Sequence, residues 1–456
     1  FPEVQGDRII QIGCVFHNFG KKTENKKYIL TLGSCDKFDE DTIIYSFADE
    51  KNVTEYNVDE LNVEEVRLIK TFESVINEEQ PDIVMTYNGF GFDNKFLMTR
   101  VKQLLMEHSF GYISKMKKAK TELKVKMLSS SALGDNILHL LTFIGRTELD
   151  LLKIVQRDHN LDSYSLNNVS QIFIGDEKDD VTPKQIFEYQ RQDSEKRGII
   201  AKYCIKDCVL LIDLMNKLDI LSANIGMANV CSVPQSFIFL RGQGIKVTSF
   251  VSKECDVQKT RMPTLKDYKE TTDGYEGAIV LEPKTGIYLD DPIAVLDYAS
   301  LYPSSIIEKN ISHETLIEDP KYLKYVDYET IEYDNYEYIE KGKSIIKKRS
   351  ETKPYEECYF INTSFLGEEG IIPSVLNDLL IQRKATKKRM FNETDEFKKK
   401  LLDGLQLAYK VTANSLYGQV GASTSPIYLK DIAASTTAVG RHNLIFAKEY
   451  SEENYP

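Results

Sequence analysis

The sequence predicts an α/β protein of the multidomain α+β kind. At roughly 100–200 residues per domain, its 456 residues are enough for about two to four domains with sizeable cores. Apolar β-rich runs alternate with helical patterns up to about residue 225, and two long helical patterns joined by a short polar turn follow residue 373. No run approaches the roughly 18 apolar residues of a membrane span, so we expect no membrane association.

The first 225 residues are expected to form one domain of strands and helices. Short runs rich in β-branched and aromatic residues predict strands at 8–16, 28–32, 42–47 and 83–87. Apolar residues recur at helical spacing elsewhere, and they predict helices at 63–78, from Asp93 onward, at 149–158 and at 196–224.

The remaining residues predict a second β region followed by a helical hairpin. Glycine and proline residues recur within residues 226–275, and this pattern predicts a linker region. Strands are expected at 278–282, 287–289 and 293–297. The tyrosine-rich, acidic stretch at about 319–360 lacks a helical stripe, and we expect a surface insertion there. Two helices are expected at 373–391 and 396–417, with Pro373 as a favourable first helical residue.

The charge distribution is compatible with a polyanionic partner, although the formal net charge is −12. Residues 100–128 and 381–400 each carry eight lysines and arginines, whereas residues 319–340 carry seven acids and two lysines. A contact with DNA must therefore be local or assisted by a metal ion. The seven cysteines are scattered without a C-x-x-C pair, which suits a reducing intracellular compartment rather than a disulfide framework.

The segment Asp297-Tyr-Ala-Ser-Leu-Tyr-Pro-Ser304 places a carboxylate directly after an apolar run. A carboxylate and a neighbouring backbone carbonyl are ligands for a hard divalent cation, and the N–H groups of the following turn suit phosphate oxygens. The same residues also fit a structural role, in which Asp297 caps a helix while Tyr302 and Pro303 pack. From this segment alone, the two interpretations carry equal weight.

The segment Lys410-x-x-x-Asn414-Ser415-x-Tyr417-Gly418 places three polar side chains on one helical face, at i, i+4 and i+7. The preceding helix carries Arg383 and Lys387 at i, i+4, and a guanidinium suits a terminal phosphate. Two ordinary amphipathic helices with solvated basic faces explain the same pattern.

A third set of residues lies in the first domain. Tyr87-Asn-Gly-Phe-Gly-Phe-Asp93 puts an acid where a strand meets a helix, and Tyr203 and Asp207 share one helical face. Asp150 is a third acid, and the sequence indicates a catalytic role for it less strongly than for Asp93 and Asp207. Clustered carboxylates hold metal ions for phosphodiester hydrolysis, and a phenol can orient the attacking water. Helix capping by Asp93 and surface exposure of Asp207 are the structural alternative.

Together these motifs resemble a family B DNA polymerase, similar to the eukaryotic delta type and its relatives in large DNA viruses. The segments 274–283 and 297–304 resemble that family's inter-domain motif and its first polymerase acid motif. Residues 410–418 match its K-x-x-x-N-S-x-Y-G helix, and residues 87–93 and 203–207 resemble the second and third motifs of its 3′–5′ proofreading exonuclease. Five motifs in the expected order make the resemblance specific.

The resemblance implies two active sites, each with two Mg²⁺ ions. In the polymerase site, Asp297 and the Tyr298 carbonyl are implied to ligate metal, and Tyr302 to exclude a 2′-hydroxyl. The residues implied to contact the incoming nucleotide or its triphosphate are Ala299, Ser300, Leu301, Arg383, Lys387, Lys410, Asn414 and Tyr417. In the exonuclease site, Asp93 and Asp207 are implied metal ligands, and Tyr203 is the implied water-orienting phenol.

The resemblance also implies a domain division and partners. The implied parts are a ribonuclease H-like exonuclease at 1–225, a linker at 226–275, the palm start at 276–372 with the insertion, the fingers at 373–418 and a return to the palm at 419–456. Primer–template DNA and dNTP are the implied partners, with a sliding clamp and accessory subunits by analogy. The implied location is the nucleus or a viral replication compartment.

Two family motifs are absent from the sequence: a D-x-E pair before residue 1 and a Y-G-D-T-D-like hairpin after residue 456. Because one carboxylate cannot hold two cations against their repulsion, we expect the chain to be a fragment that neither polymerises nor proofreads well alone. Two other interpretations stay open. One is a stand-alone 3′–5′ exonuclease, which leaves Asp297 and Lys410 unexplained. The other is a non-catalytic polymerase-like subunit that binds DNA.

Overall fold

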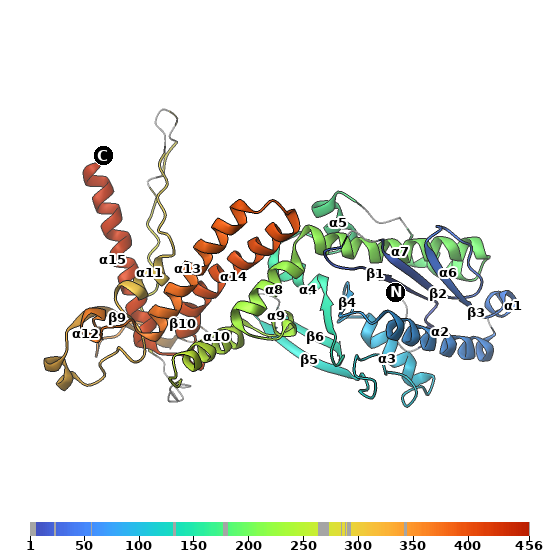
Figure 1. The fold of residues 1–456 in the computed structure, drawn as a ribbon, viewed down its shortest axis with the longest axis horizontal. Helices are drawn as coiled ribbons and strands as arrows, with labels where there is room; N and C mark the ends of the chain where they lie inside the picture. Colours follow the sequence, from blue (N-terminus) through green and yellow to red (C-terminus); the bar gives the residue numbers. More distant parts are fainter. Residues whose placement is uncertain are drawn as a thin grey trace. The chain divides into compact units, whose positions relative to one another are not determined.

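The computed structural model describes residues 6–21, 24–55, 57–130, 134–176, 181–262, 273–283, 285–287, 289, 293–341 and 344–455. The chain divides into two compact units, the N-terminal unit Phe1–Leu221 and the C-terminal unit Ser222–Pro456 (Figure 1). Among the described residues, no helix combines the length and apolar character that crossing a bilayer requires.

The strands of the N-terminal unit form three separate groups. The strands are β1 (Gln11–Phe16), β2 (Lys26–Leu32), β3 (Thr42–Phe47), β4 (Ile83–Thr86), β5 (Leu123–Ser130), β6 (Gly134–Leu141) and β7 (Thr147–Asp150). One sheet has the order β1-β2-β3, with β1 antiparallel and β3 parallel to β2. The parallel pair β4–β7 and the hairpin β5–β6 stand apart from it. The four strands that the sequence predicts in this region are confirmed.

Helices cover both faces of the three-stranded sheet. The helices of this unit are α1 (Glu50–Thr54), α2 (Val58–Glu79), α3 (Asp93–Gln103), α4 (Leu151–Asp158), α5 (Leu166–Ile174), α6 (Pro183–Gln190), α7 (Ser194–Lys217) and the start of α8 (Ile220–Cys231). Leu30 packs with Leu68 of α2, whereas its neighbour Ile29 packs with Ala201 and Ile205 of α7. Because successive strand residues point to opposite faces, α2 and α7 lie on opposite sides of β2, as Figure 1 shows.

Two predicted helices in this unit are shorter than expected. The helix predicted at 149–158 begins at Leu151, because residues 147–150 pair with β4 as the strand β7. The helix predicted at 196–224 is broken between α7 and α8, where Asp219 has a φ of 50°. The left-handed region that this φ occupies is incompatible with a continuing helix.

The C-terminal unit is built from helices around one antiparallel sheet. Its further helices are α9 (Gln235–Leu240), α10 (Gln243–Val257), α11 (Leu301–Glu308), α12 (Thr363–Leu366), α13 (Ile371–Asn392), α14 (Glu396–Val420) and α15 (Lys430–Asn454), with the short η1 (Pro320–Tyr325). The strands are β8 (Asp273–Tyr275), β9 (Tyr328–Lys341), β10 (Ser344–Arg349) and β11 (Tyr355–Ile361). Strand β9 pairs with all three others.

The predicted helical hairpin is confirmed as α13 and α14, which lie side by side in Figure 1. Asp395 ends the short turn between them, and its carboxylate accepts hydrogen bonds from the N–H groups of Phe397 and Lys398 at 2.9 and 3.1 Å. An aspartate in this position satisfies donors that the first helical turn leaves free.

The expectation of a surface insertion at 319–360 is only partly right. Tyr333 on β9 and Phe360 on β11 are 2% and 0% exposed, and both belong to the main core of the unit. By contrast, Tyr322 and Tyr325 of η1 are 52% and 66% exposed, so only a part of this segment lies at the surface. The alternation of tyrosines with acids along β9 is therefore the pattern of a strand with one buried face.

The strands predicted at 278–282 and 293–297 are wrong, and residue 288 of the strand predicted at 287–289 lies outside the described residues. The described residues between Gly277 and Ser300 lie in no strand. A strand needs a hydrogen-bonded neighbour, and the pairing of β8 with β9 ends at Tyr275. Val280 and Val295, whose apolar character motivated the prediction, are each 86% exposed.

Candidate functional site

The first candidate site is the loop of residues 87–93, which joins β4 to α3 in the N-terminal unit. Asn88 adopts a left-handed conformation with a φ of 66°, and the loop turns back sharply on Thr86. A Cβ at Gly89 would lie 2.2 Å from the Thr86 hydroxyl oxygen, so only glycine fits there. The turn ends in Asp93, the first residue of α3, whose side chain is accessible at the surface. Partial desolvation raises the pKa of the Asp93 carboxyl, and the nearby Asp150 adds to the shift.

Asp150 holds this loop in place. One carboxylate oxygen accepts the N–H groups of Asn88 and Leu152 at 2.9 and 3.0 Å, and the other accepts that of Phe90 at 3.0 Å. Asp150 is 2% exposed, so burial raises the pKa of its carboxyl despite these three donors. Asp150 thus caps α4 and braces the loop, whereas its interpretation as a third catalytic acid has no support in this geometry.

Glu148 is a buried acid beside this loop that the sequence did not point to. One of its oxygens accepts the side-chain amide of Asn94, the residue after Asp93, and the other accepts the N–H of Leu141 at 2.9 Å. Burial is the main cause that raises the pKa of Glu148 from 4.5 to about 7. The parallel pairing of β7 with β4 places Glu148 opposite Val84, and sequence periodicity could not reveal this register.

The buried Glu148 predicts that the N-terminal unit loses stability as the pH rises. The folded state keeps its proton up to about pH 7, whereas the unfolded state releases it near 4.5, so the contribution is complete below pH 4.5 and lost by pH 7. The expected loss is about 3 kcal/mol in the free energy of unfolding. Hydrogen exchange of residues 141–150 between pH 5 and 8 measures it. Glu148→Gln should flatten this dependence, whereas the exposed Glu107→Gln should not; parallel curves for wild type and Glu148→Gln would contradict the assignment.

Helix α7 carries the predicted pair Tyr203 and Asp207, one turn apart, on a firmly anchored segment. The guanidinium of Arg197, 0% exposed, donates to the carbonyls of Ser34, Gln190 and Gln192 at 2.6, 3.2 and 2.6 Å, and it pairs with Glu50. Four backbone and side-chain acceptors therefore fix the first turn of this helix against the end of β2.

The charges of Asp93 and Asp207 both act on the thiol of Cys204. The pKa of the Cys204 thiol is lowered mainly by a hydrogen bond from Cys208, and the charges of Asp207 and Asp93 both oppose this shift. The fold therefore brings the two predicted exonuclease acids, 114 positions apart in the sequence, within electrostatic range of one thiol. Among the residues that the structure describes, no three or more His, Cys, Asp or Glu side chains converge as a metal site.

The second candidate site lies in the C-terminal unit, where α11 follows Asp297. Asp297 is exposed, and the chain turns at Ser300, whose φ of 59° and ψ of 56° are left-handed. This turn starts α11 at Leu301 and puts the side chain of Tyr302 against two other helices. Tyr298 extends to α15, where its hydroxyl donates to the carbonyl of Asn443 at 2.9 Å.

Three tyrosines meet beside this turn. The rings of Tyr302 and Tyr417 stack, with centroids 4.4 Å apart and an angle of 24° between their planes. Tyr275 forms a hydrogen bond with Tyr417, and burial together with these two phenols raises the pKa of Tyr417. The structure thus brings the predicted Tyr302 and Tyr417 together and adds Tyr275, which the resemblance placed only in an inter-domain motif.

Helix α15 anchors the segment that carries Tyr275. Arg441 donates to the carbonyls of Glu276 and Gly277, both at 3.0 Å, and pairs with the Glu276 carboxylate at 3.0 Å. Thr437, one turn earlier, donates to the Glu276 carbonyl at 3.3 Å. The sequence reasoning missed Arg441 and Thr437, although a threonine and an arginine at i, i+4 on an otherwise apolar helix face were a usable signal.

The basic residues predicted to contact phosphate lie on the helical hairpin. Lys387, Lys410 and Asn414 are exposed, whereas Arg383 is half-buried and its Nε donates to the Gln406 amide oxygen of α14 at 3.3 Å. Lys410 and Asn414 are on α14, which also carries Tyr417 one turn later. The hairpin therefore presents free cationic side chains on the helix that reaches the tyrosine cluster.

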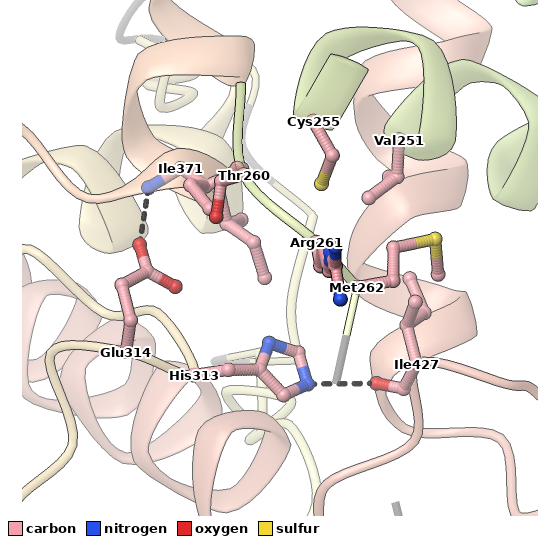
Figure 2. Close-up of a pocket in the computed structure, with 10 residues that line it drawn as sticks. Val251, Cys255, Thr260, Arg261, Met262, His313, Glu314, Ile371 and Ile427 are labelled. Carbon is pink, nitrogen blue, oxygen red and sulfur yellow. Dashed lines mark hydrogen bonds between the residues drawn. The ribbon is translucent and has the colours of Figure 1, made fainter. Parts of the chain in front are cut away.

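The C-terminal unit also contains a cavity of about 200 Å³ that includes none of the predicted site residues. Figure 2 shows His313 below the side chains of Cys255 and Met262, with the ring donating to the carbonyl of Ile427 at 3.1 Å. Burial lowers the pKa of His313, which favours the neutral form of the ring. The lining is mainly apolar, and the Glu314 carboxylate is held by the N–H of Ile371.

Known proteins resemble this chain over its whole length. Residues 1–169 match the family model "DNA polymerase family B, exonuclease domain", and residues 233–455 match the model "DNA polymerase family B". A DNA polymerase of Pyramimonas orientalis virus is 37% identical, in an alignment that covers all of this chain and 44% of that protein. The DNA polymerase delta catalytic subunit of Dictyostelium discoideum is 36% identical, with 37% of its length covered. The chain thus spans less than half of the length of these two relatives.

The fold comparison agrees with these matches. The structure of a family B DNA polymerase from the archaeon Pyrobaculum calidifontis matches with a TM-score of 0.60 and 25% identity, over 85% of this chain and 45% of that one. The exonuclease model covers residues 87–93 but not Tyr203 and Asp207, and the polymerase model covers Asp297 and Tyr417. The chain belongs to DNA polymerase family B and carries sequence from both its exonuclease and its polymerase domain.

Proposed function

We propose that the C-terminal unit contributes to template-directed DNA synthesis, in which a primer 3′-hydroxyl attacks the α-phosphate of a dNTP. The observation that carries this proposal is the contact between Tyr302 and Tyr417. Tyr302 follows the exposed Asp297 in the sequence, and Tyr417 lies on α14 with Lys410. In this proposal Tyr302 lies under the sugar, and Tyr417 lies beside the nascent base pair.

The other nucleotide contacts follow from the same arrangement. The N–H groups of Ala299, Ser300 and Leu301 face the triphosphate at the turn before α11. Lys387, Lys410 and the half-buried Arg383 supply positive charge from the hairpin, and Asn414 braces the triphosphate site. Closure of such a hairpin over the nucleotide would bring these charges to the phosphates.

We propose that the N-terminal unit contributes a 3′–5′ exonuclease that removes mispaired nucleotides. Asp93 and Asp207 are its acids, and the Tyr203 phenol on α7 orients the attacking water. The braced loop at 87–93 and the anchored first turn of α7 support this proposal, because both acids stand on rigid supports.

Metal ions are part of both proposals, since family B polymerases and their exonuclease domains are generally metal-dependent. When bound, Mg²⁺ would polarise phosphate oxygens and stabilise the leaving group. Asp297 with the Tyr298 carbonyl would hold it in one site, and Asp93 with Asp207 in the other. The described residues offer no cluster of three ligands, so they fit a part of each site and not a complete one.

Primer–template DNA and dNTP are the proposed partners, with a sliding clamp and accessory subunits by analogy with delta-type relatives. The proposed location is the nucleus or a viral replication compartment. A non-catalytic, DNA-binding role is the second candidate, and the incomplete ligand sets favour it. The exposed Asp297 and Lys410 favour catalysis instead, because neither side chain is buried in a structural role.

Replacement of Tyr302 tests the proposed sugar selection. Tyr302→Ala in the complete product of the gene should admit ribonucleotides, because loss of the ring opens space at the 2′ position. The expected loss of discrimination is roughly 10–200-fold. Single-nucleotide incorporation of dNTP and rNTP on one primer–template measures it, with Tyr322→Ala, an exposed tyrosine on η1, as the control. Unchanged discrimination would remove Tyr302 from this role.

A further inference from the structure

Helix α15 has a glycine in its interior where the ring of Tyr302 packs against it. Gly440 is buried, and α15 runs ten residues before it and fourteen after it. Glycine is the least favourable residue for a helix interior apart from proline, because it loses the most backbone freedom. A glycine in such a place therefore indicates that another group needs the space of a side chain.

The group that occupies this space is Tyr302. A Cβ added at Gly440 would lie 3.0 Å from Cε1 and 3.3 Å from Cδ1 of the Tyr302 ring, and 3.6 Å from a methyl group of Leu301. The first two distances are closer than an ordinary carbon–carbon contact of about 3.5–4.0 Å. The same ring stacks on Tyr417 with its centroid at 4.4 Å. Tyr302 is thus fixed by α14 and by the bare backbone of α15.

The helix itself is held firmly enough that the ring, and not the helix, would have to move. Arg441, next to Gly440, binds the carbonyls of Glu276 and Gly277, and Thr437 binds the first of them from the preceding turn. On the N-terminal side, Asp431 accepts a hydrogen bond from the buried Tyr333 at 2.8 Å. These contacts join α15 to the segment after β8 and to β9.

We infer that Gly440 is a specificity-determining residue, because its missing side chain sets how far the Tyr302 ring extends toward the sugar of the incoming nucleotide. This inference rests on the proposed role of Tyr302 in selecting the sugar. A methyl group at position 440 pushes the ring away from α15 by a few tenths of an ångström. The ring then enters the space of the sugar, which is the opposite of its removal in Tyr302→Ala.

Gly440→Ala should therefore raise the KM for dNTP by about five- to tenfold with little change in kcat. A misplacement of about 1 Å can lower the activity roughly a hundredfold, so the smaller displacement of the ring should have a smaller effect. The KM for rNTP should rise at least as much, so discrimination is kept or increased. Gly242→Ala is the control, because Gly242 precedes α10 as its N-cap and a Cβ there meets no atom within 4 Å. Its KM should equal that of the wild type.

A double-mutant cycle in the complete gene product tests whether the effect acts through the ring. In a Tyr302→Ala background, Gly440→Ala should leave the KM for dNTP unchanged. If Gly440→Ala alone unfolds while the double variant folds, the steric contact is also established. The inference is overturned if folded Gly440→Ala has the wild-type KM, or if it raises KM equally in both backgrounds. If Tyr302→Ala itself leaves discrimination unchanged, the proposed role of Tyr302 fails, and the inference fails with it.

Discussion

Asp297→Ala in the complete gene product should abolish primer extension and leave the excision of the primer intact. Asp297 is the one acid of the first polymerase motif, and it lies exposed at the turn before α11, where the Tyr298 carbonyl and the N–H groups of the turn follow it. Removal of a carboxylate that holds a catalytic cation takes away charge stabilisation that is present throughout phosphoryl transfer. We expect a loss on the order of a thousandfold or more in kcat/KM.

The measurement is extension of a labelled primer with dNTP, next to degradation of the same primer without dNTP. Glu308→Ala is the matched control, because Glu308 is an exposed acid at the far end of α11 and pairs with its neighbour Lys309. Extension by Asp297→Ala at more than a tenth of the wild-type rate would remove this residue from catalysis. Loss of excision as well would point to misfolding instead of a specific role.

Asp207→Ala should have the opposite effect, with excision lost and extension retained. Asp207 stands one turn after Tyr203 on α7, and its charge reaches the same thiol as the charge of Asp93. Without it the site has one acid fewer for a cation, so we expect excision to fall on the order of a hundredfold or more. Degradation of a primer with a mispaired 3′ end measures the change.

The control for this helix is Glu195→Ala, an exposed acid in the first turn of α7. This variant should keep both activities. Unchanged excision in Asp207→Ala would contradict the exonuclease assignment, whereas the loss of both activities would show that Asp207 stabilises the fold.

The sequence predicted the helical hairpin well but missed α10, which lies in the predicted linker region, and α15, and it predicted the strands of the second unit poorly. A helix makes its hydrogen bonds within one segment, so the periodicity at 373–391 and 396–417 was enough to find α13 and α14. A strand depends on a partner that can be remote in sequence. The apolar runs around Val280 and Val295 had the composition of strands but pair with no described strand.

The same difference between local and remote contacts separates the residues of the candidate sites. Asp93, Tyr203, Asp207, Asp297 and Tyr302 stand in local motifs, so the sequence alone could point to them. Residues that act through remote contacts could not be found in this way. These residues are Glu148, Arg197 and Gly440. Glu148 binds Asn94, Arg197 binds Ser34 and Gly440 leaves space for the ring of Tyr302, and only the fold brings these residues together.

We propose that the chain carries parts of two opposing activities, synthesis in the C-terminal unit and excision in the N-terminal unit. One paired assay on a labelled primer–template with Mg²⁺ tests it most directly. The assay compares the 456-residue chain with the complete product of its gene. We predict that only the complete product extends the primer with dNTP and degrades it without dNTP. If neither protein does either while both bind the DNA, the claim is contradicted, and a non-catalytic DNA-binding role takes its place.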